Sequence, residues 1–308
     1  MTAKSIFSLS TGLLAAAALA LTGCTNASQQ GAAASASSSS FNVSAIQKDA
    51  TLAAAVPQAL RDKGTLVMGS DTSYAPAEFL GGTDGQTPVG YDVDLAKAIG
   101  ALLGLKIDVQ SAAFTSILPS LGPKYDLSAS SFFITNERKQ AANFVSYLSA
   151  GTQWAVQQGN PKKFSLDDIC GRSIAVQTGS FQETKDLAGR NDKCAAAGKP
   201  AIKIVSLKNQ TDVTTRLVNG SVDAMPAGSI TIAYAVTQTK GQLESFGDVY
   251  EASPVGIAVA KNDLPFTDVV AKAMNKLIEN GDYKKILDEW GVGSVAITKA
   301  EVNPDVPK

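Results

Sequence analysis

Short apolar runs alternate with helical patterns over most of the chain, and this alternation constrains the fold more than any other feature. Residues 66–69 are a short apolar run that predicts a strand, and residues 91–104 open on acidic residues and carry apolar side chains at helical spacing. Further strands are predicted at 106–110, 126–130, 173–177, 203–206 and 222–225, and helices at 115–121, 211–219 and 230–236. Such alternation produces mostly parallel sheets with helices on both faces, so we predict an α/β fold.

Two segments break the alternation and divide the predicted fold into two lobes. Residues 149–157 and 251–260 are β-like, contain glycine and are not followed by an obvious crossover helix, whereas a long amphipathic helical region follows at 266–290. A block inserted between two connecting strands leaves a ligand cleft between the lobes, because ligands of open α/β sheets bind at the carboxyl ends of strands. We predict a discontinuous lobe 1 over 46–150 plus 256–308, and lobe 2 over 151–255.

The N-terminus predicts a lipoprotein signal peptide over residues 1–23. Lys4 precedes an apolar run that is too short to span a bilayer, and the run ends in Leu-Thr-Gly-Cys. This ending resembles the lipobox of bacterial lipoproteins, in which the cysteine, here Cys24, is acylated; the alternative is an ordinary secretory signal with an incidental cysteine. Residues 24–45 are a low-complexity tract that predicts a flexible tether. We expect a lipid-anchored protein outside the cytoplasmic membrane, at the cell surface or in the periplasm.

Composition excludes several classes of function. The net charge of −1 gives no basic field for nucleic acid, so no nucleic-acid partner is expected. The chain has no histidine, which removes the Ser-His-Asp and Cys-His nucleophile systems and the commonest metal ligand, and we expect neither a metal nor a cofactor. Cys170 and Cys194 remain as an even pair in an oxidising compartment and predict a disulfide, with two free buried thiols as the alternative.

A series of motifs follows the predicted elements in a fixed order. The motifs are Leu66 to Pro76, Val89 to Ala96, Phe114 to Leu121, Tyr125 to Ser128, Ile134 to Arg138 and Gly220 to Ala224. In this order and spacing they resemble the polar-amino-acid solute-binding proteins of bacterial ABC importers (family 3). The resemblance implies a two-lobed periplasmic-binding-protein-like fold of type II. It also implies a monomer that closes on a small zwitterion with a carboxylate and delivers it to a membrane permease and, through it, to an ATPase.

The resemblance also implies a set of ligand-binding residues. Arg138 matches the residue that binds the carboxylate, because an arginine fork bonds a carboxylate through two N–H groups and the helix start near Ser180 adds donors. The alternative is an exposed helix cation paired with a neighbour. Asp71 and Tyr74 match a polar pocket residue and an aromatic cover, and Phe114 matches the opposing aromatic wall. The full predicted set is Asp71, Tyr74, Phe114, Ser130, Ser131, Phe133, Arg138, Gln177, Ser180, Phe181 and Gln182.

Three positions depart from the family pattern. Phe133 and Phe181 stand where small hydroxyl residues are usual, and Gly228 stands where an acidic residue usually binds the α-ammonium of the ligand. Two ligand hypotheses follow. In the first, the ligand is a polar amino acid whose ammonium is bound by Asp71. In the second, it is an ectoine- or betaine-type compatible solute whose delocalised or methylated cation lies among aromatic faces, since an ammonium buried without a carboxylate is costly.

Two functions of other classes stay open. Dehydratases related to these binding proteins need a positioned acid in the cleft, and the best position for one is Gly228, which leaves only Asp71 and Glu78. We therefore expect that the chain is not an enzyme. A sensory lipoprotein without transport would bind a ligand by the same closure.

Overall fold

The computed structural model describes residues 42–306; the predicted signal peptide, Cys24 and residues 25–41 of the predicted tether lie outside this range. None of the helices within it is long and apolar enough to cross a membrane. The last residues of the predicted tether form a short 3-10 helix (Val43–Ala45), and Ile46, where lobe 1 is predicted to begin, packs against the core. Two helices, α1 (Ala50–Ala55) and α2 (Gln58–Lys63), then lead into the first strand.

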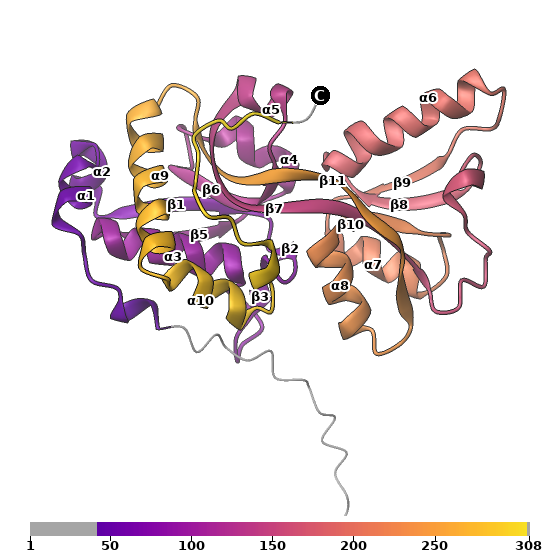
Figure 1. The fold of residues 1–308 in the computed structure, drawn as a ribbon, viewed down its shortest axis with the longest axis horizontal. Coiled ribbons are helices and arrows are strands. Elements are labelled where there is room, and N and C mark those ends of the chain that lie inside the picture. Colours follow the sequence, from indigo (N-terminus) through magenta and orange to yellow (C-terminus); the bar gives the residue numbers. More distant parts are fainter. Residues whose placement is uncertain (1–41, 307–308) are drawn as a thin grey trace, which may run out of the picture. The chain divides into compact units, whose positions relative to one another are not determined.

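Two long antiparallel strands, β7 (Ala142–Gln157) and β11 (Leu243–Ala260), join two parts of the molecule, lobe 1 and lobe 2 (Figure 1). The sequence predicted only the second half of each strand. The predicted lobe boundaries fall inside these strands, and the exact division stays a prediction. Pairing between them is irregular near Tyr250 and between Val255 and Gly256.

Lobe 1 is built on three parallel strands continued by the two long ones. β1 (Thr65–Ser70) lies between β5 (Lys106–Ser111) and β6 (Leu127–Phe133), and β11 pairs antiparallel with β6. The complete order is β10-β7-β11-β6-β1-β5. The sheet is therefore mixed and not mostly parallel as predicted, since the chain leaves lobe 1 along β7 and returns along β11 in the opposite direction.

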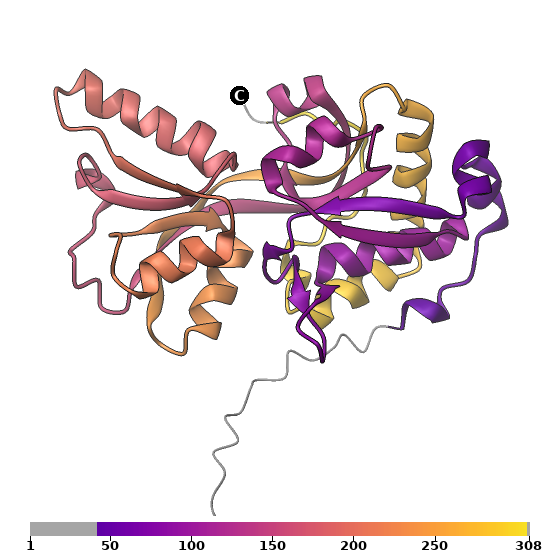
Figure 2. The ribbon, with the colours of Figure 1, turned by 180° about the vertical axis from the view of Figure 1, so that it is seen from behind.

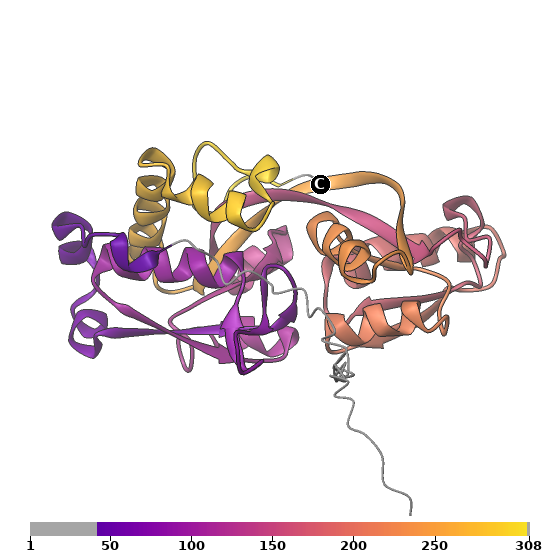
Figure 3. The ribbon, with the colours of Figure 1, turned by 90° about the horizontal axis from the view of Figure 1, so that it is seen from below.

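Helices cover both faces of this sheet, as the alternation predicted. α3 (Tyr91–Leu103), α9 (Leu264–Glu279) and α10 (Asp282–Glu289) pack on one face, and α4 (Phe114–Ile117) with a 3-10 turn (Leu118–Ser120) lies on the other (Figures 1 and 3). The region predicted as one helix at 266–290 is α9 and α10. The break falls at Gly281, whose φ of +80° is a left-handed conformation that ends a helix and that glycine adopts without strain.

Lobe 2 contains the parallel strands β8 (Ser173–Gln177) and β9 (Lys203–Leu207), and β10 (Met225–Gly228) pairs with β7. Its helices lie on both sides of these strands (Figures 1 and 2). They are a π-helical turn (Gln182–Leu187), α6 (Ala188–Ala196), α7 (Gln210–Val218), α8 (Ser229–Gln238) and a 3-10 turn (Leu166–Asp168). The strand predicted at 222–225 begins three residues later, because Ala224 makes only a single bridge to Ile174 before the chain turns to β7.

A disulfide and a small sheet complete the fold. Cys170 and Cys194 are bonded to each other, as predicted, and tie the start of β8 to α6. The small sheet consists of β2 (Ser73–Tyr74), β3 (Glu78–Gly81) and β4 (Thr87–Val89), and it places Tyr74 at the boundary between the lobes. One more helix, α5 (Asn136–Ala141), follows β6 and carries Arg138.

Candidate functional site

The predicted ligand residues come together around one small cavity where the lobes meet. Ten of the eleven line it, and only Asp71 does not, although it is hydrogen-bonded to one of the ten. Lobe 1 contributes Tyr74, Phe114, Ser130, Ser131, Phe133 and Arg138, and lobe 2 contributes Gln177, Ser180, Phe181 and Gln182. The cavity encloses about 10 Å³, which is room for about one water molecule. The predicted open cleft is therefore closed in this structure, and an amino acid can enter only if the lobes or the side chains move.

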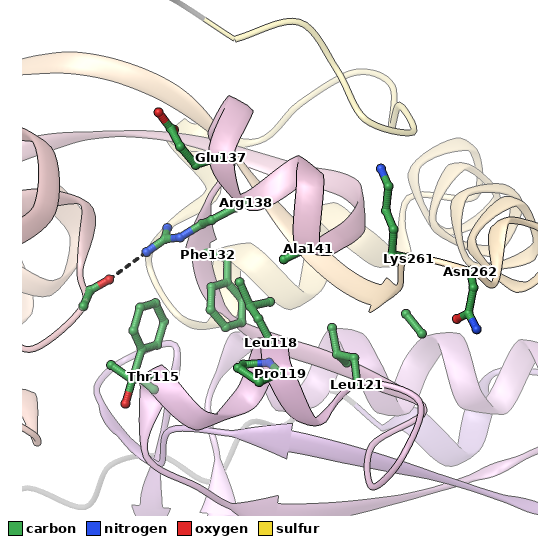
Figure 4. A pocket seen from close by; sticks show the side chains of 13 residues that line it. Thr115, Leu118, Pro119, Leu121, Phe132, Glu137, Arg138, Ala141, Lys261 and Asn262 are labelled. Carbon is green, nitrogen blue, oxygen red and sulfur yellow. Dashed lines mark hydrogen bonds between the residues drawn. The ribbon is translucent and has the colours of Figure 1, made fainter.

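Arg138 bridges the two lobes. The hydroxyl of Thr135 caps α5 by accepting a hydrogen bond from the Arg138 amide at 3.2 Å, which sets the first turn of the helix. The guanidinium donates through Nη1 to the Phe133 carbonyl at 2.8 Å and through Nη2 to the Gly179 carbonyl of lobe 2 at 3.0 Å (Figure 4). Burial lowers the pKa of Arg138 to about 10, so the group is still charged at neutral pH. Two of its five N–H groups are thus engaged with the backbone and do not face a free cleft.

A groove of about 930 Å³ adjoins the enclosed cavity; Arg138 and Phe114 line both, and Gly179 lines the groove. The Arg138 guanidinium lies 5.4 Å from the centre of the Phe114 ring and 5.6 Å from that of Phe132. Figure 4 shows Arg138 at one end of the groove and Lys261 at the other. The arginine is therefore held by aromatic faces on one side and backbone carbonyls on the other, and it is not the exposed helix cation considered as the alternative.

Two buried carboxyl groups lie behind the serines of the site. The Ser130 hydroxyl donates to Glu78 Oε1 at 2.9 Å, and Asp92 Oδ2 accepts from the amide and hydroxyl of Ser131 at 2.8 and 3.2 Å. Burial and the neighbouring Asp92 raise the pKa of Glu78 well above its ordinary range, and burial also raises the pKa of Asp92. Glu78 therefore holds a proton more readily than an exposed glutamate does, and the two carboxyl groups fix the wall of the cavity by holding both serine side chains.

Only part of the signal for this carboxyl pair is present in the sequence. Glu78 was considered as a possible cleft acid, and Asp92 was assigned to the start of a helix, where acidic residues are common. The structure places both fully inside lobe 1. The two bonds to Asp92 hold Ser131 at a φ of +46°, which is unusual outside glycine and which only the structure reveals.

Asp71 is also enclosed, and each of its oxygens accepts two hydrogen bonds. Oδ1 accepts from the Ser73 amide at 3.2 Å and hydroxyl at 2.6 Å, and Oδ2 accepts from the Phe114 amide and from Gln177 Nε2, both at 3.0 Å. Burial raises the pKa of Asp71, and the bonds from Ser73 and Phe114 act in the opposite direction. Asp71 therefore fixes the start of α4 and connects lobe 1 to lobe 2 through Gln177.

The aromatic side of the cavity is formed by residues from both lobes. The rings of Phe133 and Phe181 stack, with their centres 5.6 Å apart and their planes inclined by 16°. The Tyr74 hydroxyl accepts from the Gly228 amide at 3.0 Å, and a Cβ on Gly228 would lie 2.9 Å from that hydroxyl. The predicted position of Gly228 at the site is consistent with this contact, and Tyr74 fills the space where a side chain would otherwise lie.

The helix start in lobe 2 offers fewer free donors than predicted. The Gly179 amide donates to Glu183 Oε2 at 2.5 Å, and the Glu183 amide donates to the Ser180 hydroxyl at 3.2 Å. Gln182 points the other way and donates to the Thr152 hydroxyl at 2.9 Å. Glu183 and Ser180 cap this turn themselves. Some of the backbone N–H groups near Ser180 are therefore already hydrogen-bonded and are not free for a ligand.

Contacts outside the cavity also join the lobes. The Gln210 amide donates to the Ser73 hydroxyl at 3.1 Å, and Phe79 lies 6.1 Å from Tyr234, measured between ring centres. Lys185 and Glu137 form an exposed ion pair at 2.5 Å. Lobe closure thus rests on polar and aromatic contacts on several sides of the cavity.

The chain belongs to the bacterial extracellular solute-binding proteins, family 3, whose family model matches residues 66–293. It is 35% identical over 252 residues to the arginine-binding protein ArgT of Corynebacterium glutamicum, covering 81% of this chain and 82% of that one. Its fold is similar to that of an ancestral arginine-binding protein bound to arginine, with a TM-score of 0.66, 30% identity and coverage of 74% and 98%. A third similar structure is the ancestral amino-acid-binding protein AncCDT-1, a precursor of cyclohexadienyl dehydratase (TM-score 0.63, 27% identity, coverage of 78% and 99%). The predicted family and the two-lobed fold are confirmed.

Proposed function

We propose that this chain is the extracytoplasmic binding protein of an ABC importer and captures an amino acid of the arginine type between its lobes, for delivery to a membrane permease. The observation that carries the proposal is the convergence of Arg138 with Asp71, Tyr74 and Phe114 at the boundary between the lobes. The group for an anion and the groups for a cation thus meet in one place. The relatives named for arginine support the ligand class.

Arg138 binds the carboxylate of the ligand in this proposal. Two of its five N–H groups hold the backbone carbonyls of Phe133 and Gly179, and three are left for a ligand. Because the guanidinium is already oriented by these carbonyls and by aromatic faces, little side-chain freedom is lost when a carboxylate binds. Charge-assisted hydrogen bonds of this kind contribute about 1.5–3 kcal/mol each.

The cation of the ligand is a guanidinium in this proposal. A delocalised, weakly hydrated cation can stack on aromatic rings, and Tyr74 and Phe114 offer such rings beside the carboxylate of Asp71. Arginine therefore meets the requirement for a delocalised cation that Phe133 and Phe181 place on the ligand, while its α-ammonium has no acidic partner at Gly228. An ectoine- or betaine-type solute meets it too, but lacks the support of the relatives.

The residues around the cavity also favour ligand binding over catalysis. None of the ten described residues that line it is an acid, since Glu78 and Asp92 lie behind the serines and Asp71 already accepts four hydrogen bonds. A dehydratase-like reaction would need an acid that faces the ligand. We therefore propose a binding protein and not an enzyme.

A ligand series with matched variants tests the proposal. Calorimetry should show binding of arginine, weaker binding of agmatine, which lacks the carboxylate, and weaker binding of citrulline, in which a neutral ureido group replaces the guanidinium. Arg138→Ala should weaken arginine binding by about 100-fold, because a buried carboxylate loses its charged partner, and should leave the affinity for agmatine nearly unchanged. Dominant binding of ectoine or glycine betaine, or an equal loss for arginine and agmatine, would contradict the proposal.

Anchoring through Cys24 belongs to the same proposal and rests on the sequence. A lipid anchor would keep the binding protein close to its permease, and the low-complexity tract after Cys24 would let it reorient. Metabolic labelling with a fatty-acid analogue should mark the wild type and not Cys24→Ser. Equal labelling of the two would show that the chain is released by an ordinary signal.

A further inference from the structure

The last described segment of the chain, residues 296–306, follows the lobe 1 edge of β7, and we name it the C-terminal strap. It lies beyond the match to the family model, which ends at residue 293. Antiparallel bridges join Ala296 to Leu148 and Val302 to Val145. In Figure 1 its yellow trace ends beside α5, the helix that carries Arg138. The strap therefore covers an edge that would otherwise expose unpaired backbone groups.

Asn303 fixes the strap to the residues that directly follow α5. Its amide donates to the Phe144 carbonyl at 2.7 Å, and its Oδ1 accepts from the Phe144 amide at 2.9 Å. Its Nδ2 donates to Asn143 Oδ1 at 3.1 Å. The φ of Asn303 is +49°, a left-handed conformation that asparagine tolerates better than most residues. One residue thus pairs with the backbone and the side chains at the end of α5.

The strap also contacts α5 itself and the residues that precede it. The Pro304 carbonyl accepts from Lys139 Nζ at 2.9 Å, and Lys139 is the neighbour of Arg138 in the helix. Val306 packs against the apolar cluster that contains Ile134, and with Thr135 it lines a cavity of about 290 Å³. The strap consequently holds α5 at both of its ends.

We propose that the C-terminal strap is a positioning element for Arg138, so that the carboxylate of the ligand meets a guanidinium that is already in place. A helix of six residues such as α5 is too short to be stable by itself, so its orientation depends on what is packed around it. A binding group placed with a small error loses much of its effect, which makes such supporting contacts functional. The inference rests on the proposed function, because it takes Arg138 to bind a carboxylate.

The test compares two asparagines that hold the strap at different points, Asn303 at the residues after α5 and Asn275 at Ala300. Asn303→Ala loosens the end at α5. Asn275→Ala is the matched control, because Asn275 bonds both the amide and the carbonyl of Ala300, each at 3.0 Å or less, and holds the strap to α9 and not to the residues around α5. The readout is the ratio of the agmatine to the arginine dissociation constant, which isolates the contribution of the carboxylate. We expect Asn303→Ala to lower this ratio about fivefold and Asn275→Ala to leave it unchanged.

Two further variants are included so that the test has a clear outcome even if Asn303→Ala does not fold. Lys139→Met breaks the bond to Pro304 from the side of the helix and should lower the ratio in the same direction, which covers the case in which Asn303→Ala does not fold. In an Arg138→Ala background Asn303→Ala should have no further effect on the ratio. An unchanged ratio in Asn303→Ala and Lys139→Met, or an equal fall in Asn275→Ala, would overturn the inference.

Hydrogen exchange separates this inference from the proposed function. If neither arginine nor agmatine binds, the proposed function fails, and the exchange rates of the α5 amides then decide the role of the strap. Faster exchange over 136–141 in Asn303→Ala than in Asn275→Ala would retain the strap as the support of α5. Equal exchange in the two variants would overturn it.

Discussion

Both lobes bury carboxyl groups, but they compensate the buried charge in different ways. In lobe 2, Asp186 is 9% exposed and is paired with Arg190 at 2.7 Å, while Tyr250 donates to its second oxygen at 2.5 Å. In lobe 1, the ion pairs found among residues 42–306 include neither Asp71 nor Glu78 nor Asp92. These three groups rely on neutral donors and, for Glu78, on retaining a proton.

The difference separates a carboxylate that stabilises a lobe from carboxyl groups that shape a site. The charge of a buried acid that is paired with its own cation is already compensated, so a bound ligand should not change the stability of that pair. The acids of lobe 1 border the cavity at Ser130, Ser131 and Gln177 and have no ion pair of their own, so a cationic ligand would bring a positive charge that could pair with them. We therefore expect changes in lobe 2 to act on stability and changes in lobe 1 to act on protonation and binding.

The largest effect is expected when the lobe 2 pair is broken by Arg190→Met. Methionine keeps apolar contact with the rings of Trp154 and Tyr250, which lie 5.5 and 5.6 Å from the guanidinium, but leaves Asp186 without a cation. The free energy of unfolding should fall by about 2 kcal/mol, less than for a fully buried pair because Arg190 is 22% exposed. Denaturant unfolding measures this change, and the affinity for arginine should stay within about twofold.

Lys284→Met is the control for that change. Lys284 and Asp288 form an exposed i, i+4 pair in α10, and its loss should alter stability by less than about 0.5 kcal/mol. If Arg190→Met were as stable as this control, the pairing in lobe 2 would not compensate the burial of Asp186. If it weakened binding as strongly as Arg138→Ala, the contrast between the lobes would be wrong.

The sequence could predict much of the fold because its signals are local. Apolar spacing, helix starts and glycine stops identify elements within a few residues, and the pairing of Cys170 with Cys194 followed from composition alone. The ten residues around the cavity were implied by the resemblance to family 3, which the motifs of the chain carry in their order and spacing. The role of each residue toward a ligand stays a prediction.

What the sequence could not predict depends on contacts between distant residues. Ser130 is bound by Glu78, 52 positions earlier, and Asp71 by Gln177, 106 positions later, and neither partner is marked by spacing. The free guanidinium that was expected at Arg138 is engaged by Gly179 because lobe closure brings that carbonyl within reach. The C-terminal strap has neither helical nor strand periodicity, so only its pairing with β7 reveals it.

The smallest effect is expected for Glu78→Gln, which tests whether Glu78 holds a proton at neutral pH. Glutamine can donate as a protonated glutamate does, so the bond network with Ser130 and Asp92 should persist. Because the folded protein keeps a proton that the unfolded chain releases above the ordinary pKa of 4.5, the wild type should lose stability as the pH rises from about 4.5 through the raised pKa of Glu78. The variant lacks this loss, so its advantage should be absent below pH 4.5 and should grow as the pH rises from 4.5 toward the raised pKa of Glu78. Melting temperatures of both proteins between pH 4 and 8 measure the difference, and Glu279→Gln on the exposed side of α9 controls for the change in net charge. A variant that is less stable than the wild type at neutral pH, by an amount that does not depend on pH, would show that Glu78 is ionised and that lobe 1 compensates its charge as lobe 2 does.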